Sequence, residues 1–209
     1  MPSSTKTYAA VGAFTGWFAL LLQLYLIIQN RVASVPETLI RYFSFFTILT
    51  NILVAISFSA VCLKGISSEG NFFGRPKTLT AIAVYISIVG LIYNTILRFI
   101  WAPQGWDRVA DELLHLIIPV VFIIFWVKFV PKQNIEWKNV LPWTIYPIVY
   151  LGYTLLRGPS AQWYPYPFID VITLGYNNVL INSTMVTAVF IIISLLFIGI
   201  AKMMSKRSD

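Results

Sequence analysis

One histidine and two hydroxyl residues carry the side chains that nucleophilic catalysis requires. His115 is the only histidine of the chain, and it lies about one turn inside an apolar run, residues 113–130, that is long enough to cross a membrane. An ionisable side chain in such a run is costly to bury and usually serves a function. Because an unperturbed imidazole is largely neutral near neutral pH, it can take a proton from a hydroxyl. We therefore predict that His115 is a general base and that Ser44 or Thr47 is the nucleophile.

Asp111 and three other polar residues are placed to support this reaction. Asp111 precedes His115 by four residues, so both side chains fall on one face of a helix and the carboxylate can orient the imidazole. Asn51, Asn94 and Arg98 lie in other apolar stretches and are candidate donors to a developing oxyanion or groups that orient the catalytic residues. Together with His115, these polar side chains predict the transfer of an acyl group to the hydroxyl of Ser44 or Thr47.

Three more residues complete the predicted site. Trp163 begins the segment 163–168, in which aromatic residues and prolines alternate, and Asp170 follows it. Asn182 lies near the start of the last apolar stretch. We predict that these residues contact the substrate or orient the catalytic groups. A structural interpretation stands beside this one, since aromatic rings gather at membrane interfaces and membrane hydroxyls often bond to the preceding turn.

The elements that position these residues belong to a membrane protein. Hydrophobic residues make up 58% of the chain, charged residues 11%, and the mean hydropathy is +0.76. In a soluble domain about a quarter of the residues are charged. Six stretches are long and apolar enough to cross a bilayer: 8–29, 39–63, 78–101, 110–130, 139–157 and 178–201. The sequence therefore predicts an all-α bundle of six transmembrane helices, with both termini on one side, as a single domain over residues 1–209.

The distribution of Lys and Arg predicts the orientation of this bundle. Ten of the 15 basic residues would lie on the side of the termini: Lys6, Lys64, Arg75, Lys77, Lys128, Lys132, Lys138, Lys202, Lys206 and Arg207. Because cytoplasmic loops carry an excess of basic residues, we predict cytoplasmic termini in the cell membrane. The net charge of +7 then reflects contact with anionic membrane lipids, and no nucleic-acid partner is expected.

Spacing within two stretches predicts how the site is built. Ser44, Thr47 and Asn51 follow one another at three and four residues, which places them on one face of a continuous helix. Pro119 follows His115 by four residues and lacks the amide that would bond the His115 carbonyl. We therefore expect the helix to open locally beside the histidine.

Neither a metal nor a cofactor is expected. The single cysteine, Cys62, cannot form an intramolecular disulfide, and no Cys/His cluster has metal-ligand spacing. The chain also lacks phosphate-binding and dinucleotide-binding loops and the glycine-flanked serine of a nucleophile elbow. The first apolar stretch is too long for a signal peptide, so we expect it to be a helix of the mature chain.

Three segments resemble the family of androgen-induced gene 1 and the androgen-dependent TFPI-regulating protein. They are Arg-Tyr-Phe-Ser-Phe at 41–45, Asp-Glu-Leu-Leu-His-Leu-Ile-Ile-Pro at 111–119 and Trp-Tyr-Pro-Tyr-Pro-Phe-Ile-Asp at 163–170. The resemblance extends over nearly the whole chain in the order of its spans. It implies a membrane hydrolase that cleaves fatty acid esters of hydroxy fatty acids with a threonine and a histidine. His115 then takes the histidine role and Ser44 stands where the threonine is expected, a departure that keeps Thr47 as the alternative.

Three other classes of protein remain open. A small transporter or ligand-binding protein would use the same cavity without catalysis, although no internal repeat is apparent. A structural or partner-binding membrane protein would need neither Ser44 nor His115. An intramembrane serine protease would use the same chemistry on a peptide bond, but Ser44 lies between Phe43 and Phe45 instead of glycines. Of these classes we predict a lipid ester hydrolase whose lipid substrate comes from the bilayer. The sequence predicts no oligomeric state.

Overall fold

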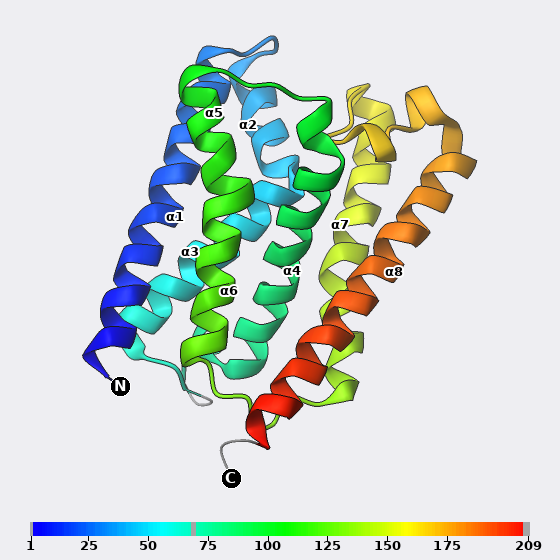
Figure 1. The fold of residues 1–209 in the computed structure, drawn as a ribbon. Coiled ribbons are helices and arrows are strands. Elements are labelled where there is room, and N and C mark those ends of the chain that lie inside the picture. The colour runs from blue at the N-terminus through cyan, green and yellow to red at the C-terminus, as the bar shows by residue number, and fades with distance from the viewer. Residues whose placement is uncertain (1, 68–69, 207–209) are drawn as a thin grey trace.

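The computed structural model describes residues 2–67 and 70–206, and all the regular secondary structure within them is helical (Figure 1). Its helices are α1 (Ser3–Gln29), α2 (Val35–Ser44), α3 (Phe46–Lys64), α4 (Pro76–Thr95), α5 (Gly105–Glu112), α6 (Ile118–Phe129), α7 (Val140–Ala161) and α8 (Val171–Ser205). A π-helical turn, Leu113–Ile117, joins α5 to α6. Short 3₁₀ turns lie at Phe72–Gly74, Leu97–Phe99, Trp137–Asn139 and Pro167–Ile169. Arg207, one of the residues used to predict the orientation, lies outside the described residues.

Five helices of the described chain are long and apolar enough to span a membrane. They are Ser3–Gln29, Phe46–Lys64, Pro76–Phe99, Gly105–Phe129 and Val171–Ser205. α7 occupies the predicted stretch 139–157 and is 22 residues long, but it contains Pro147 and several tyrosines and is not among these five. The chain is therefore built as a multi-pass membrane protein.

The predicted stretch 39–63 is not one helix. Phe45 has an extended backbone, with φ −80° and ψ 126°, and it separates α2 from α3. The prediction that Ser44, Thr47 and Asn51 share one face of a continuous helix was therefore wrong. This break is the feature of the fold with the largest consequence for the site.

α4 is the central helix of the bundle. It contacts α3, α6 and α8, while α1 packs along α3. Gly12 and Gly16 of α1 allow this close packing: an added Cβ would lie 2.7 Å from the Phe58 ring and 3.1 Å from Ala55 Cβ. Large apolar side chains are exposed along the outer faces of α1, α6 and α8, as expected for surfaces that contact lipid.

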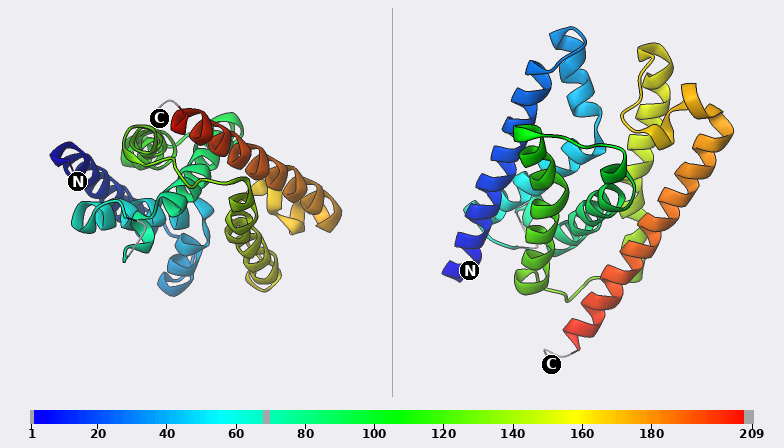
Figure 2. Two further views of the ribbon diagram at one scale, coloured as in Figure 1. Left: turned by 90° about the horizontal axis from the view of Figure 1, so that it is seen from below. Right: turned by 45° about the horizontal axis from the view of Figure 1, so that its top comes forward.

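Both termini lie at the same end of the bundle (Figure 1). We call the opposite end, which contains residues 30–34, 96–104 and 162–170, the distal end. Figure 2 shows α7 and α8 together at one side of the bundle, with the segment 162–170 between them at the distal end. This segment contacts α8 and reaches α3, so it brings residues distant in sequence close to the start of α3.

Candidate active site

The break at Phe45 places Thr47 at the second position of α3. In a continuous helix the Thr47 amide would bond to the preceding turn, but here it donates to the Tyr166 hydroxyl at 3.1 Å. The Ser44 carbonyl on the other side of the break accepts a hydrogen bond from the Tyr150 hydroxyl at 2.9 Å. Two tyrosines thus satisfy the backbone groups that the break frees, and they hold Thr47 at a helix N-terminus.

A π-helical turn around the histidine opens the backbone of the α5–α6 unit. Within the turn Leu113–Ile117, the Ile118 amide donates to the carbonyl five residues earlier instead of to the Leu114 carbonyl. Pro119 has no amide for the His115 carbonyl. The carbonyls of Leu114 and His115 therefore lack their usual helical partners, as the proline had predicted for His115.

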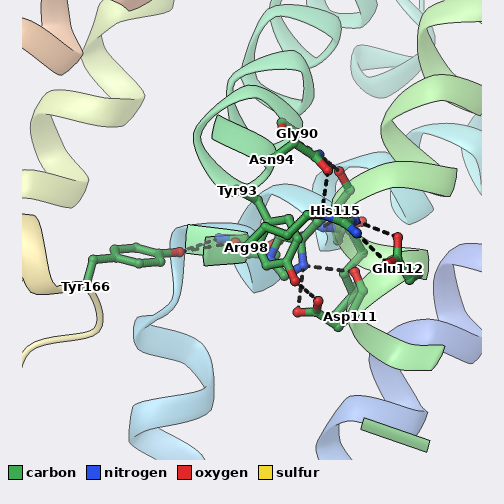
Figure 3. Close-up of polar contacts among 11 residues, drawn as sticks. Gly90, Tyr93, Asn94, Arg98, Asp111, Glu112, His115 and Tyr166 are labelled. Carbon is green, nitrogen blue, oxygen red and sulfur yellow. Dashed lines mark hydrogen bonds and ion pairs between the residues drawn. The ribbon is translucent and has the colours of Figure 1, made fainter. Parts of the chain in front are cut away.

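Two asparagines from neighbouring helices bind these carbonyls. Asn51 Nδ2 of α3 donates to the Leu114 carbonyl at 3.2 Å, and Asn94 Nδ2 of α4 donates to the His115 carbonyl at 3.2 Å. Gly90 permits the approach of α4, since an added Cβ would lie 3.3 Å from the His115 carbonyl oxygen. The π-turn is therefore fixed from both sides, and with it the position of the imidazole (Figure 3).

The imidazole of His115 lies between Asp111 and Thr47. Its Nδ1 is 2.9 Å from the Asp111 carbonyl oxygen and 3.2 Å from Asp111 Oδ1. Both oxygens accept hydrogen bonds, so in the neutral ring Nδ1 carries the proton and Nε2 is an acceptor. Nε2 lies 3.3 Å from Thr47 Oγ1, which can donate to it. The three residues therefore have the types and the hydrogen-bonded order that a nucleophile, a base and an orienting group would need.

Tyr93 and the Arg98–Glu112 pair hold the other side of this arrangement. The Tyr93 ring stacks on the imidazole, with centroids 4.0 Å apart and planes 15° apart, and its hydroxyl donates to the Asp111 carboxylate. Arg98 donates from both terminal nitrogens to the Glu112 carboxylate, at 2.8 and 2.7 Å. These contacts restrict the rotation of both Asp111 and the imidazole.

Tyr166 faces Thr47 from the segment between α7 and α8. Its hydroxyl oxygen lies 3.2 Å from Thr47 Oγ1, in addition to its bond with the Thr47 amide. Burial raises the pKa of the Tyr166 phenol above its ordinary value, so the hydroxyl keeps its proton and stays a potential donor. Figure 3 shows this side chain approaching the site from the side opposite Asp111.

Ser44 is not part of this arrangement. Its hydroxyl donates to the Ile40 carbonyl at 2.7 Å and lies 2.9 Å from the Tyr153 hydroxyl of α7. The hydroxyl within reach of His115 is that of Thr47. The Ser44/His115 pair that we placed first on sequence grounds is therefore corrected to Thr47/His115.

Trp163, Asp170 and Asn182 hold the segment that carries Tyr166. The Trp163 ring lies against the guanidinium groups of Arg41, at 5.0 Å, and Arg157, at 5.7 Å. Asp170 caps the start of α8, accepting from the amides of its first turn, and Asn182 Nδ2 donates to a carbonyl of the segment at 2.9 Å. These three residues therefore hold the segment, and with it Tyr166, in position.

Asn51, Asn94 and Arg98 were predicted as donors to an oxyanion or as orienting groups, and their contacts are of the second kind. Their nitrogens donate to backbone carbonyls, to Glu112 and, from Arg98 Nε, to Asn94 Oδ1 at 3.0 Å. Neither Tyr93 nor Tyr166 was among the residues predicted for the site. Tyr166 had a signal, because it lies in the segment 163–170 that carried the family resemblance, whereas Tyr93 was distinguished only by its place next to Asn94.

A cavity of about 350 Å³ opens beside these residues. Thr47, Asp111 and His115 line it, with aromatic and aliphatic side chains such as Tyr42 and Ile27 forming most of the wall. Its size and composition are those of a site for a small molecule or part of a lipid. Among the described residues, no group of three or more His, Cys, Asp or Glu side chains is arranged to hold a metal ion.

Comparisons of the chain with protein-family models, with curated proteins and with solved structures give no match. The candidate site is therefore interpreted from its own geometry.

Proposed function

We propose that the protein is a membrane-embedded hydrolase of lipid esters, with Thr47 as nucleophile and His115 as general base. The observation that carries the proposal is the continuous chain of contacts from Thr47 Oγ1 through the imidazole to Asp111. The tautomer that this chain favours leaves Nε2 free to accept the threonine proton. No cofactor is needed for this chemistry.

The reaction has two steps. Thr47 Oγ1 attacks the ester carbonyl as its proton passes to His115 Nε2, and the C–O bond to the alcohol breaks as the same proton passes to the leaving oxygen. Water then attacks the acyl-threonine, giving one proton to Nε2, and the Oγ1–C bond breaks as that proton returns to Thr47. Asp111 stabilises the imidazolium that exists between these transfers.

Two donors lie where negative charge would develop on the carbonyl oxygen. The first is the Thr47 amide. The second is the Tyr166 hydroxyl, which accepts a hydrogen bond from that amide in the structure and would rotate to donate its own proton to the oxyanion. The N-terminus of α3 adds a favourable dipole at the same point. Each such donor contributes about 2.7–4 kcal/mol to transition-state stabilisation in well-studied hydrolases.

The lipid character of the substrate follows from the place of the site. The catalytic residues lie near the distal end of helices that could span a membrane, and apolar side chains surround the cavity. We propose that α7 is a sixth span, that both termini are cytoplasmic and that the distal end faces outward. The ester carbonyl would then reach Thr47 while the alkyl chains stay in the bilayer. The family resemblance suggests fatty acid esters of hydroxy fatty acids as the first substrates to assay.

Labelling of the purified protein with a fluorophosphonate, followed by mass spectrometry of the modified peptide, tests this proposal. We expect one adduct, on Thr47, that is lost in Thr47→Ala and strongly reduced in His115→Ala, while Ser44→Ala is labelled like the wild type. An adduct on Ser44 would contradict our assignment of the nucleophile. No adduct and no ester hydrolysis by folded wild-type protein would refute the hydrolase and leave the cavity as a binding or transport site.

A further inference from the structure

A second, smaller cavity also reaches Thr47. It has a volume of about 80 Å³ and is bounded by α4, α7, α8 and the segment 166–169. Thr47, Tyr93, Leu97 and Tyr166 line both cavities, so the two adjoin at the nucleophile. His115 lines only the larger one. We call the smaller one the α8 chamber and the larger one the histidine cavity.

The chemistry of the proposed reaction distinguishes the two spaces. The imidazole must give its proton to the leaving alcohol oxygen, so the alcohol part of the ester has to lie on the side of His115 Nε2. The acyl part stays bonded to Thr47 until water removes it, and the water must be activated by the same imidazole. The alcohol and then the water therefore occupy the histidine cavity, and the acyl chain needs space on the other side of Thr47.

The lining residues fit this division. None of the residues that line the α8 chamber is charged, and its walls include Ile88, Ile92 and Val186. The histidine cavity also contains Gln23 and Asp107. A hydrocarbon chain is compatible with the first environment, whereas an alcohol with polar substituents, and water, are compatible with the second.

We infer that the α8 chamber binds the acyl carbons next to the ester carbonyl and that the histidine cavity binds the alcohol part of the ester. A volume of about 80 Å³ holds only a few methylene groups, so the rest of a longer acyl chain extends beyond the chamber. The inference rests on the proposed function and deepens it, because it names two subsites and the residues that select the start of the acyl chain. Val186 and Ile92 become specificity-determining residues, although neither lines the histidine cavity.

Two series of esters test the inference with the full-length protein in detergent. One series varies the acyl chain from two to sixteen carbons at a constant alcohol, and the other varies the alcohol at a constant acyl group. The variants are Val186→Trp of α8 and Ile92→Phe of α4 in the chamber, and Ile27→Trp in the histidine cavity. Met185→Trp is the matched control, because Met185 neighbours Val186 but is 62% exposed on the outer surface.

We expect Val186→Trp and Ile92→Phe to lower kcat/KM by about tenfold or more for acyl chains of four carbons and longer and to leave the two-carbon ester nearly unaffected, as for methylenes excluded from an apolar pocket. Ile27→Trp should change the alcohol series instead, and Met185→Trp neither. An acyl-length profile unchanged in both chamber variants, or shifted by Ile27→Trp alone, would overturn the subsite assignment while the hydrolase stands. Absence of hydrolysis in the wild type would refute the proposed function itself, and the subsites with it.

Discussion

Ser44 and Thr47 are hydroxyl residues three positions apart, and both are buried, yet they have different surroundings. The Ser44 hydroxyl is bonded to its own helix and to Tyr153. The Thr47 hydroxyl lies at a helix N-terminus, between an imidazole and a phenol. The first environment satisfies a hydroxyl structurally, whereas the second provides a base for its proton and donors for an oxyanion. Burial and residue type do not distinguish these hydroxyls, and only their partners do.

The physical origin of this difference is the extended backbone at Phe45. A continuous helix would keep residues three apart on neighbouring positions of one face. The break changes the direction of the chain between the two residues and frees the amide of Thr47 for a ligand or a side chain. A nucleophile at such a helix start has its own amide available to the oxyanion that it creates.

The largest expected effect is on kcat, when Thr47 and Ser44 are each replaced by alanine. Thr47→Ala should lower kcat for ester hydrolysis by about 10⁶, the effect of removing a nucleophile that acts with a histidine in a well-studied hydrolase. Ser44→Ala should leave kcat within about twofold and lower the free energy of unfolding by about 1 kcal/mol, since only structural hydrogen bonds are lost. Steady-state kinetics and thermal unfolding of both variants measure this. Equal losses of kcat would show that the contrast between the two sites is wrong.

A second comparison concerns the tyrosines that contact the two hydroxyls. Tyr166→Phe should lower kcat by about 10² with little change in KM, because the lost donor acts on the transition state. Tyr153→Phe, which removes the partner of Ser44, should change neither constant by more than about twofold. Steady-state kinetics of both variants, which give kcat and KM separately, measure this difference. A rise in KM alone for Tyr166→Phe would assign the phenol to substrate binding.

Two asparagines offer a subtler contrast. Asn94 and Asn178 each donate to the carbonyl four residues earlier, but only Asn94 also binds the His115 carbonyl. Asn94→Leu should lower kcat by about tenfold, because the π-turn loses one of its supports and the imidazole loses its position. Asn178→Leu should have no effect on kcat. We expect the optimum pH to stay the same in both variants, since neither amide exchanges a proton with substrate; a shifted optimum would contradict a positioning role.

The smallest expected effect is on stability, and it comes from the ion pairs of α2, the helix that ends at Ser44. Hydrogen bonds from Arg41 and Arg157 lower the pKa of Glu37 below its ordinary value of 4.5, and they connect α2 to α7. The stabilisation is therefore present above about pH 4.5 and is lost as the pH falls through the lower pKa of the folded protein. Glu37→Gln should unfold a few degrees below the wild type at pH 7, and the difference should shrink steadily as the pH falls below 4.5. A difference that does not depend on pH would assign the effect to packing.

Much of the local structure was predictable from the sequence, because it depends on residues close together in the chain. Apolar runs of bilayer length gave the helices and the membrane class. The spacing of four residues between Asp111 and His115 predicted their contact, and Pro119 predicted the open backbone at the histidine. Helical periodicity and the missing proline amide act within a few turns, so no tertiary information was needed.

Which hydroxyl lies next to His115 depended on contacts between distant segments. The break at Phe45 leaves a carbonyl and an amide without helical partners, and these are bound by Tyr150 of α7 and by Tyr166, 106 and 119 residues further along the chain. The two asparagines that fix the π-turn likewise come from α3 and α4. A helix can be interrupted inside an apolar bundle only where other side chains satisfy its freed backbone groups. The sequence by itself determined which residues could react, and tertiary packing decided that Thr47, rather than Ser44, meets His115.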